Sequence, residues 1–236
     1  MRQNIPELPV WKGPLSHPFY SIVVKRIFDF LLALILLVPG LILMIPVAIA
    51  VRLDSEGPIF YRAPRGGYHN KTFLIFKFRT MVKDAEKTGG TTALNDSRVT
   101  RVGRILRKTK LDEIPQILNI LTGDMSFIGP RPELLRYTMR YTRDQECILW
   151  VRPGISDESS LVYINQDELL GTENPVENYE KYILDHKNAL RVKYALNQSF
   201  LLDAKLFLRT ITGVFKKAKR VVREETAKAA PGKENA

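Results

Sequence analysis

The chain has 236 residues, with 36 Lys or Arg and 25 Asp or Glu side chains, and its formal net charge is +11. The length suffices for one domain with a hydrophobic core, and the charge favours polyanionic partners such as nucleic acid, anionic lipid or phosphorylated substrates. The single cysteine, Cys147, excludes an intrachain disulfide, and three dispersed histidines form no Cys/His zinc pattern. This cysteine usage favours a reducing, cytoplasmic environment for the bulk of the chain.

The N-terminal part contains a long apolar segment. Residues 1–24 have few periodic apolar positions and are predicted to be an irregular lead-in. Residues 30–51 are 22 positions without a charge, long enough to reach across a hydrocarbon core of about 30 Å at about 1.5 Å per residue. The segment starts too late and is too long for a cleavable signal peptide. We therefore predict a membrane helix over 25–52.

The flanks and the prolines of this helix favour a re-entrant form. Lys25 and Arg26 precede the apolar run and Arg52 follows it, so a straight span would leave one positive flank outside. Pro39 lies near the middle of the run and is expected to break the helix into a hairpin. A kinked helix that crosses the membrane once is the alternative. Asp29 lies three residues after Arg26, a spacing that predicts an anchoring ion pair at the membrane interface.

A cytoplasmic domain is expected to follow the membrane helix, from residue 53 to residue 223, with a small β element near its start. Residues 59–61 and 72–81 are predicted strands, and the basic stretch 62–70 between them is a predicted loop. Lys77 and Arg79 alternate along the second strand, so both are expected on one face. Two neighbouring cations suit a phosphate, although the pair taken alone is better explained as a solvated strand face.

Next come a predicted mobile loop at 83–97 and a basic helix at 98–108, whose arginines could also rest on lipid headgroups. Residues 109–121 then carry two adjacent acids, Asp112 and Glu113, where a helix should begin. Pro115 marks that start, because proline is comfortable only in the first turn of a helix. Free N–H groups there favour carboxylates, and they also favour a phosphate or a metal-bound diphosphate.

Ordinary helix capping also explains the two acids, since Thr109 stands three residues before Asp112 in the spacing of a capping box. The context favours more than capping. Basic residues crowd the segment before the acids, and Arg131 follows in a Gly- and Pro-rich segment. Acids held between two basic segments indicate an anion site.

The rest of the chain is predicted to be mostly helical, which makes the domain an α+β fold. Helices are expected at 134–150 and 175–196, with a polar loop at 157–172 that could lie over the site. Ser199 is expected to cap a last helix whose apolar face ends in five cations before residue 224. That pattern fits an interfacial helix as well as it fits a core helix with a solvated tail. Residues 224–236 are predicted to be disordered.

Five motifs in this order resemble one family. They are KRIFD at 25–29, FKFRTM at 76–81, LDEIPQ at 111–116, GDMSFIGPRPE at 123–133 and RPGI at 152–155. Together they span about 20–155 and are similar to those of the polyprenol-phosphate sugar-1-phosphate transferases of bacterial glycan assembly, also called monotopic phosphoglycosyl transferases.

The resemblance implies a re-entrant membrane helix, a magnesium ion and an Asp-Glu dyad in which Asp112 is the nucleophile and a metal ligand and Glu113 assists. It implies transfer of a sugar 1-phosphate from a UDP-sugar to undecaprenyl phosphate, with release of UMP, on the cytoplasmic face of the bacterial inner membrane. The step would open the assembly of a surface polysaccharide or glycoconjugate. Our candidates for phosphate contacts are Lys77, Arg79, Arg107, Arg131 and Arg152.

The sequence departs from the family pattern in two places. The membrane helix has Val38 before Pro39 where members commonly have Ser-Pro, and SDESS at 156–160 replaces the usual Thr-Gly-Leu-Trp-Gln continuation. The second departure leaves the sugar open. A membrane-attached basic scaffold without catalysis is the alternative function, but no nucleic-acid-binding module accompanies the basic segments, so membrane lipids are the expected partners and nucleic acid is not. Homo-oligomerisation stays open.

Overall fold

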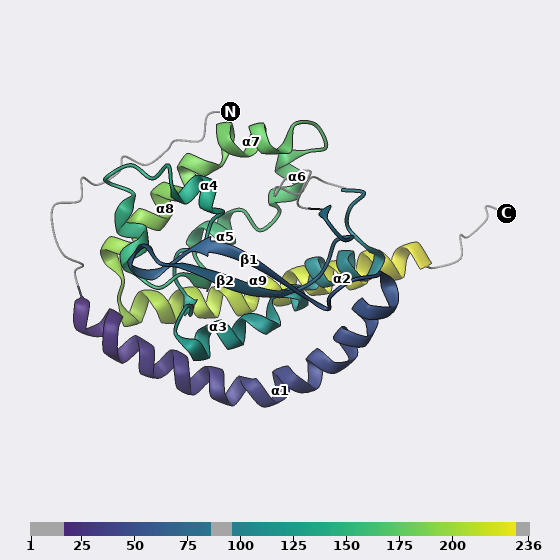
Figure 1. The fold of residues 1–236 in the computed structure, drawn as a ribbon, viewed down its shortest axis with the longest axis horizontal. Coiled ribbons are helices and arrows are strands. Elements are labelled where there is room, and N and C mark those ends of the chain that lie inside the picture. Colours follow the sequence, from purple (N-terminus) through teal and green to yellow (C-terminus); the bar gives the residue numbers. More distant parts are fainter. Residues whose placement is uncertain (1–16, 86–95, 230–236) are drawn as a thin grey trace.

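The computed structural model of the protein describes residues 17–85 and 96–229 (Figure 1). The longer helices are α1 Lys25–Asp54, α2 Arg101–Thr109, α7 Pro175–Tyr182, α8 Leu184–Asn197 and α9 Phe200–Ala229. The shorter helical segments are η1 Tyr20–Val24, η2 Tyr68–Asn70, η4 Leu111–Gln116, α3 Ile117–Thr122, α4 Leu135–Thr138, η5 Glu146–Trp150, α5 Glu158–Val162 and α6 Gln166–Leu170. The strands are β1 Phe60–Gly66, β2 Thr72–Phe78, β3 Ser126–Ile128 and β4 Gly154–Ser156. The prediction of a mostly helical α+β fold is confirmed.

The apolar segment forms one long curved helix. Figure 1 shows α1 as an arc along one side of the domain, with both of its ends against the other elements. The predicted break at Pro39 is absent: the helix runs through Pro39 and Pro46 and bends, because an apolar helix tolerates the single hydrogen bond that each proline removes. The helix also begins earlier than predicted, since the π-helical turn η1 occupies the end of the expected irregular lead-in.

Both ends of α1 are fixed to the domain by buried polar contacts. At the N-terminal end, the Lys25 ammonium lies 2.5 Å from a carboxylate oxygen of Asp203 on α9. At the C-terminal end, the Arg79 guanidinium donates to the carbonyl of Val51 in the last turn of the helix at 3.2 Å, a group that the helix leaves unpaired. It also donates to the carbonyls of Ser55 and Glu56, which follow the helix. The ends of the arc therefore return to one body, as a re-entrant helix requires.

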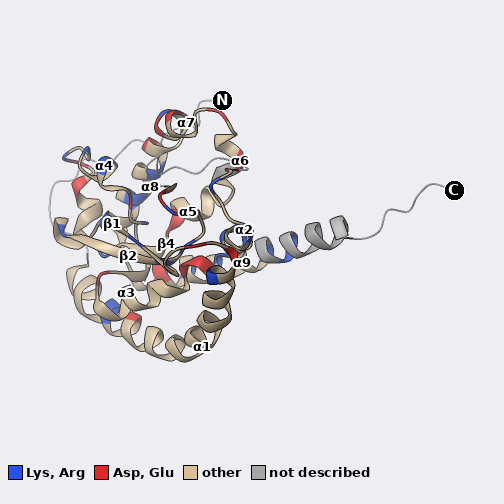
Figure 2. Cartoon of the chain, turned by 45° about the vertical axis from the view of Figure 1, so that its right-hand side comes forward, with Lys and Arg blue, Asp and Glu red and all other residues tan. Residues whose placement is uncertain are grey.

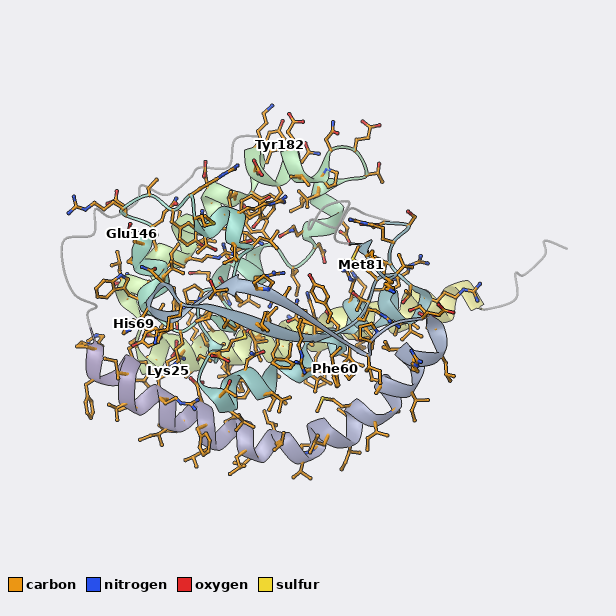
Figure 3. All side chains as sticks on the ribbon, in the orientation of Figure 1. Lys25, Phe60, His69, Met81, Glu146 and Tyr182 are labelled. Carbon is orange, nitrogen blue, oxygen red and sulfur yellow. The ribbon has the colours of Figure 1, made fainter. Side chains whose placement is uncertain are left out.

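The helix is apolar enough to cross a membrane by length and composition, with a mean hydropathy of 2.9 over its most apolar window. Figure 2 shows almost no charged residue along α1, whereas Lys, Arg, Asp and Glu gather over the rest of the domain. Side chains built of carbon project from the outer side of the arc in Figure 3. Among them, Ile35 and Val38 are 68% and 62% exposed. An apolar outer face of this size marks a surface for a lipid or a protein partner.

The predicted ion pair between Arg26 and Asp29 is wrong. The Arg26 guanidinium instead donates to the carbonyls of Ile120 and Leu121 at the end of α3, where unpaired carbonyls accept cations. Asp29 is buried and accepts from the backbone N–H of Phe127 at 3.3 Å. Arg26 thus anchors α1 to the end of α3, and Asp29 anchors it to the GDMSF segment.

Strands β1 and β2 form an antiparallel hairpin that pairs Phe60 with Phe78 and Gly66 with Thr72. β1 runs further than predicted, because part of the expected basic loop at 62–70 continues the strand. Pro64 does not prevent this, since a strand in a two-stranded sheet has a free edge that needs no N–H. The hairpin therefore carries Lys77 close to its end.

Strands β3 and β4 are parallel and join the two family motifs that contain Gly129 and Gly154. A Cβ atom on Gly129 would lie 2.3 Å from the backbone oxygen of Arg152, and one on Gly154 would lie 2.1 Å from the Gly129 nitrogen. Only glycine fits at either position. The close backbone contact fixes the segment that carries Arg131 onto the segment that carries Ile155.

The C-terminal half differs from the prediction in how its helices are divided. The helix expected over 134–150 is two short pieces, α4 and η5, and the helix expected over 175–196 is α7 and α8. The polar segment 157–172 forms the short helices α5 and α6 instead of a loop. Buried Val192, Leu206 and Cys147 join α8, α9 and η5 in one core.

Helix α9 begins after Ser199, whose hydroxyl accepts from the N–H of Leu202, so the predicted cap is confirmed. The helix runs to Ala229, into the stretch predicted to be disordered, and 230–236 lie outside the described residues, as do 86–95 of the predicted mobile loop. Leu201 and Phe215 on α9 are 79% and 70% exposed. Leu206 on the same helix is buried, so one face of α9 packs in the core, and contact of its exposed face with a membrane interface stays a prediction.

Candidate active site

The Asp-Glu pair lies at the start of a short helix, as predicted. Lys110 adopts a left-handed conformation with φ of 64°, which ends α2 and turns the chain into η4. Asp112 and Glu113 occupy the first turn of η4, and Pro115 lies within it. η4 is a 3₁₀-helix of only six residues, so the helix dipole at its N-terminus is weak. Side chains from other elements must therefore set the charge of the site.

Glu113 is held by two cations. Arg131 grips both of its carboxylate oxygens through two guanidinium nitrogens, and the Lys77 ammonium lies 3.2 Å from Oε1. Burial alone would raise the pKa of Glu113, but Arg131 and Lys77 overcome it and hold that pKa well below its usual range. Glu113 is therefore ionised and fully paired.

Asp112 is in the opposite situation. It is 6% exposed, and among the described residues its Oδ1 has no hydrogen-bond partner. Burial and the charge of Glu113 raise the pKa of Asp112, whereas Lys77, Lys110 and Arg107 act to lower it. Two adjacent carboxylates thus differ in role: one is committed to cations, and the other keeps a free oxygen at a cationic site.

Lys77 reaches Glu113 because β2 is fixed beside the helix that carries the dyad. The side-chain amide of Asn119, which is fully buried, donates to the carbonyl of Leu74 at 2.8 Å and accepts from the N–H of Phe76 at 2.9 Å. These two bonds replace the neighbouring strand that β2 lacks on this side. They set the distance between Lys77 and Glu113.

Arg131 enters the site from the segment after β3. Besides gripping Glu113, its guanidinium donates to the carbonyl of Ile155. Its backbone N–H donates to a carboxylate oxygen of Asp157 at 3.0 Å. The prediction that Arg131 lies near the dyad agrees with this geometry.

The other three predicted phosphate contacts are placed differently. Arg107 donates to the hydroxyl of Thr80 at 2.8 Å, and its charge acts on Asp112. Arg79 donates to the carbonyls of Glu56 and Ser55 after α1, so its partners are backbone groups, whereas those of Lys77 include Glu113. Arg152 packs over the ring of Tyr68 and donates to backbone carbonyls beside the start of α1, away from the dyad's cations.

The site fits a magnesium ion that is shared with a substrate. Mg²⁺ is commonly held by one or two carboxylates together with substrate phosphates rather than by an all-protein cage. Arg131 and Lys77 occupy the oxygens of Glu113, so Asp112 is the carboxylate of the pair that could hold such an ion. Across the described ranges 17–85 and 96–229, no group of three or more His, Cys, Asp or Glu gathers as an all-protein site would require.

The sequence analysis did not single out several residues of this site. Lys110 was included only among the basic residues before the acids, and Asn119 was given no role. Asp157 and Arg191 were also missed. The signal for Asp157 was present, since it lies in the segment that departs from the family pattern.

Comparison with known proteins identifies the family. The model of the bacterial sugar transferase family matches residues 20–217. The chain therefore belongs to the bacterial sugar transferase family, and the predicted class, a phosphoglycosyl transferase, is confirmed. A scaffold without catalysis is correspondingly disfavoured.

Several curated proteins are similar over long stretches. The uncharacterized sugar transferase EpsL of Bacillus subtilis (strain 168) is 34% identical over 81% of this chain and 87% of its own length. The UDP-glucose:undecaprenyl-phosphate glucose-1-phosphate transferase of Escherichia coli (strain K12) is 33% identical over 91% of this chain and 45% of its own length. A UDP-N-acetylgalactosamine-undecaprenyl-phosphate N-acetylgalactosaminephosphotransferase of Aeromonas hydrophila is 40% identical over 63% of this chain and 36% of its length. The chain thus spans less than half of these last two relatives.

Proposed function

We propose that the protein transfers a sugar 1-phosphate from a UDP-sugar to undecaprenyl phosphate and releases UMP. The observation that carries this proposal is the different pairing of the two acids, Asp112 and Glu113. Glu113 is paired with Arg131 and Lys77, whereas Asp112 keeps a free carboxylate oxygen beside the same cations. The names of the E. coli and Aeromonas relatives support the donor and acceptor classes.

The chemistry is a double displacement at phosphorus. A carboxylate oxygen of Asp112 attacks the sugar-bearing phosphorus, the bond from that phosphorus to the bridging oxygen breaks, and UMP leaves with the bonding electrons. An oxygen of the lipid phosphate then attacks the same phosphorus and expels the Asp112 carboxylate, which restores the enzyme. Lys77, Arg107 and Arg131 are positioned to neutralise the phosphate charge during both steps.

Asp112 would hold a magnesium ion through the oxygen that is not attacking, with the donor diphosphate as the other ligand. When bound, the ion would neutralise charge that builds on the leaving phosphate. Glu113 is less suited to that role, because Arg131 and Lys77 already occupy its oxygens.

We also propose that α1 is re-entrant, with the catalytic domain on the cytoplasmic face of the bacterial inner membrane. Both ends of α1 are tied to the same domain by Lys25 and Arg79, and its exposed side is apolar. Impermeant thiol labelling in whole spheroplasts tests this placement, using a cysteine placed in turn at Val10 and at Ser199. Protection of both positions is expected, and labelling of the first alone would establish a spanning helix.

The central experiment omits the lipid acceptor. With UDP-sugar and Mg²⁺ alone, the enzyme should release about one equivalent of UMP and gain the mass of a sugar phosphate on the peptide that contains Asp112. A panel of UDP-sugars identifies the donor in the same assay. Asp112→Asn should abolish release and adduct, whereas Asp185→Asn, which changes an exposed acid on α8, should keep both.

Two results would count against the proposal. UMP release that depends strictly on the lipid acceptor, with no adduct after rapid acid quench, would reject Asp112 as a covalent carrier. Absence of UMP release with every donor and with undecaprenyl phosphate present would reject the reaction itself.

A further inference from the structure

A second group of buried charges lies beyond the dyad, where the segment after β3 meets α8. Arg191 on α8 is only 1% exposed and contacts two acids. One of its terminal nitrogens lies 3.0 Å from Glu133, and its Nε lies 3.5 Å from Asp157. Tyr179 also donates to Glu133. None of these side chains touches the Asp112 carboxylate, so the mechanism above does not explain why they are charged.

Asp157 accepts hydrogen bonds from four groups, more than the one or two that a helix-capping side chain usually accepts. Its two oxygens accept from the N–H of Arg131 at 3.0 Å, from the hydroxyl of Ser159 at 2.8 Å, and from the N–H and hydroxyl of Ser160 at 2.6 Å each. Asp157 is itself 1% exposed. A neutral residue of the same shape would leave several of these donors unpaired.

The two acids stand on either side of Arg131. Asp157 holds the Arg131 backbone directly, and Glu133 follows two residues later in the chain. Arg191 contacts both Asp157 and Glu133. One arginine of α8 therefore holds the two acids that flank Arg131, the residue that binds Glu113. The parallel contact of β3 with β4 supplies the frame, and it continues to the Pro130 carbonyl, which accepts from the Gly154 N–H at 3.1 Å. The next backbone N–H along the chain, that of Arg131, is bonded to Asp157 instead.

We propose that Asp157, paired with Arg191, is a positioning residue for Arg131 in the transfer reaction. Its carboxylate orients the Arg131 backbone so that the guanidinium can grip Glu113 and face the donor phosphates. The inference rests on the proposed function, since that function gives Arg131 its task. It also accounts for the departure at 156–160: the Ser-Asp-Glu-Ser-Ser segment provides both the acid and the two serines that fix its oxygens.

A double-mutant cycle tests whether Asp157 acts through Arg131. Asp157→Asn should lower kcat/KM for the UDP-sugar by about 100-fold, as small displacements of a positioning group can. In an Arg131→Met background, the same change should lower the residual kcat/KM by less than about twofold, because the group that it orients is gone. Losses that multiply in the double variant would overturn the proposal, since damage to stability alone is independent of Arg131.

The matched control is Glu158→Gln, which removes the next acid along the chain. Glu158 is partly exposed and its ion pair with Arg209 spans 4.0 Å, so its removal should change kcat/KM by less than twofold. If Asp157→Asn does not fold, Ser160→Ala removes one donor to Asp157 and leaves the charge pair intact. Its smaller, severalfold loss should likewise vanish in the Arg131→Met background.

Amide hydrogen exchange supplies a readout that needs no turnover. Asp157→Asn should speed exchange of the Arg131 amide at least tenfold, while the Gly129 amide, which donates to Ser156, should exchange at the wild-type rate. An unchanged Arg131 amide would overturn the proposal. If the wild-type protein released no UMP, the proposed function would fail, and this exchange measurement would still decide whether Asp157 holds Arg131.

Discussion

Asn119 makes the link between β2 and the dyad testable by a single substitution. Replacing Asn119 with Leu keeps the size of the side chain but removes both the donor to Leu74 and the acceptor for Phe76. The N–H of Phe76 and the carbonyl of Leu74, which are bonded to Asn119 at a partly buried place, would lose that partner. Each such group costs about 1–3 kcal/mol.

The added apolar surface of leucine offsets part of that cost, so we expect a net destabilisation of roughly 2–4 kcal/mol. For a domain of this size that corresponds to a fall in Tm of about 5–15 °C. The assay is thermal unfolding of the purified protein in nanodiscs, followed by tryptophan fluorescence. UMP release should fall as well, because Lys77 would no longer be fixed beside Glu113.

The control is Asn197→Leu. Asn197 is exposed on α8 and donates only to a carbonyl of its own helix, so the change should move the free energy of unfolding by less than about 0.5 kcal/mol. If Asn119→Leu lowered Tm no more than this control, the side-chain amide would not be holding the strand, and the account of how Lys77 reaches the dyad would be refuted.

Two further changes test packing and charge. A Cβ on Gly103 would lie 2.1 Å from the Thr80 carbonyl oxygen, so Gly103→Ala should lower the free energy of unfolding by about 1–3 kcal/mol. In the control Gly213→Ala the nearest atom is 3.7 Å away, so this change should raise Tm. Equal shifts in Tm for the two variants would refute the close contact between Gly103 and Thr80. Burial and Arg191 lower the pKa of Lys187 from 10.5 to about 8, so the unfolded state binds more protons between these values. Stability should therefore rise by about 3 kcal/mol from pH 8 to 10.5, and this rise should be absent in Lys187→Met; parallel curves would contradict it.

Local signals predicted the features that depend on short stretches of chain. Pro115 fixed the start of the helix that carries the dyad, the alternation over 72–78 predicted β2, and Ser199 marked the start of α9. Each of these three features depends mainly on residues that are close in the sequence, so its prediction needed no knowledge of distant partners. The chemistry of the dyad, which the family motifs imply, stays a prediction.

The partners of the cations could not be predicted in this way. Arg79 and Lys77 are two residues apart, yet one caps α1 and the other meets Glu113. Arg152 sits in a family motif but contacts the start of α1. Charge and spacing do not distinguish an arginine that faces a phosphate from one that faces backbone carbonyls, because both acceptors are anionic or partly so. Only the path of the chain separates them.

The path of the chain also explains why two neighbouring carboxylates can do different work. A lone Asp-Glu pair in a first turn would share one environment, and each acid would oppose ionisation of the other. Here Arg131 arrives from the segment after β3 and Lys77 from β2, and both contact Glu113. Both cations are paired with Glu113, so Oδ1 of Asp112 has no hydrogen-bond partner among the described residues. Asp112 still lies close enough to Lys77, Lys110 and Arg107 for their positive charges to act on it. A nucleophile that must attack an anionic diphosphate needs this combination, since a fully paired carboxylate would be unreactive and an isolated one would repel its substrate.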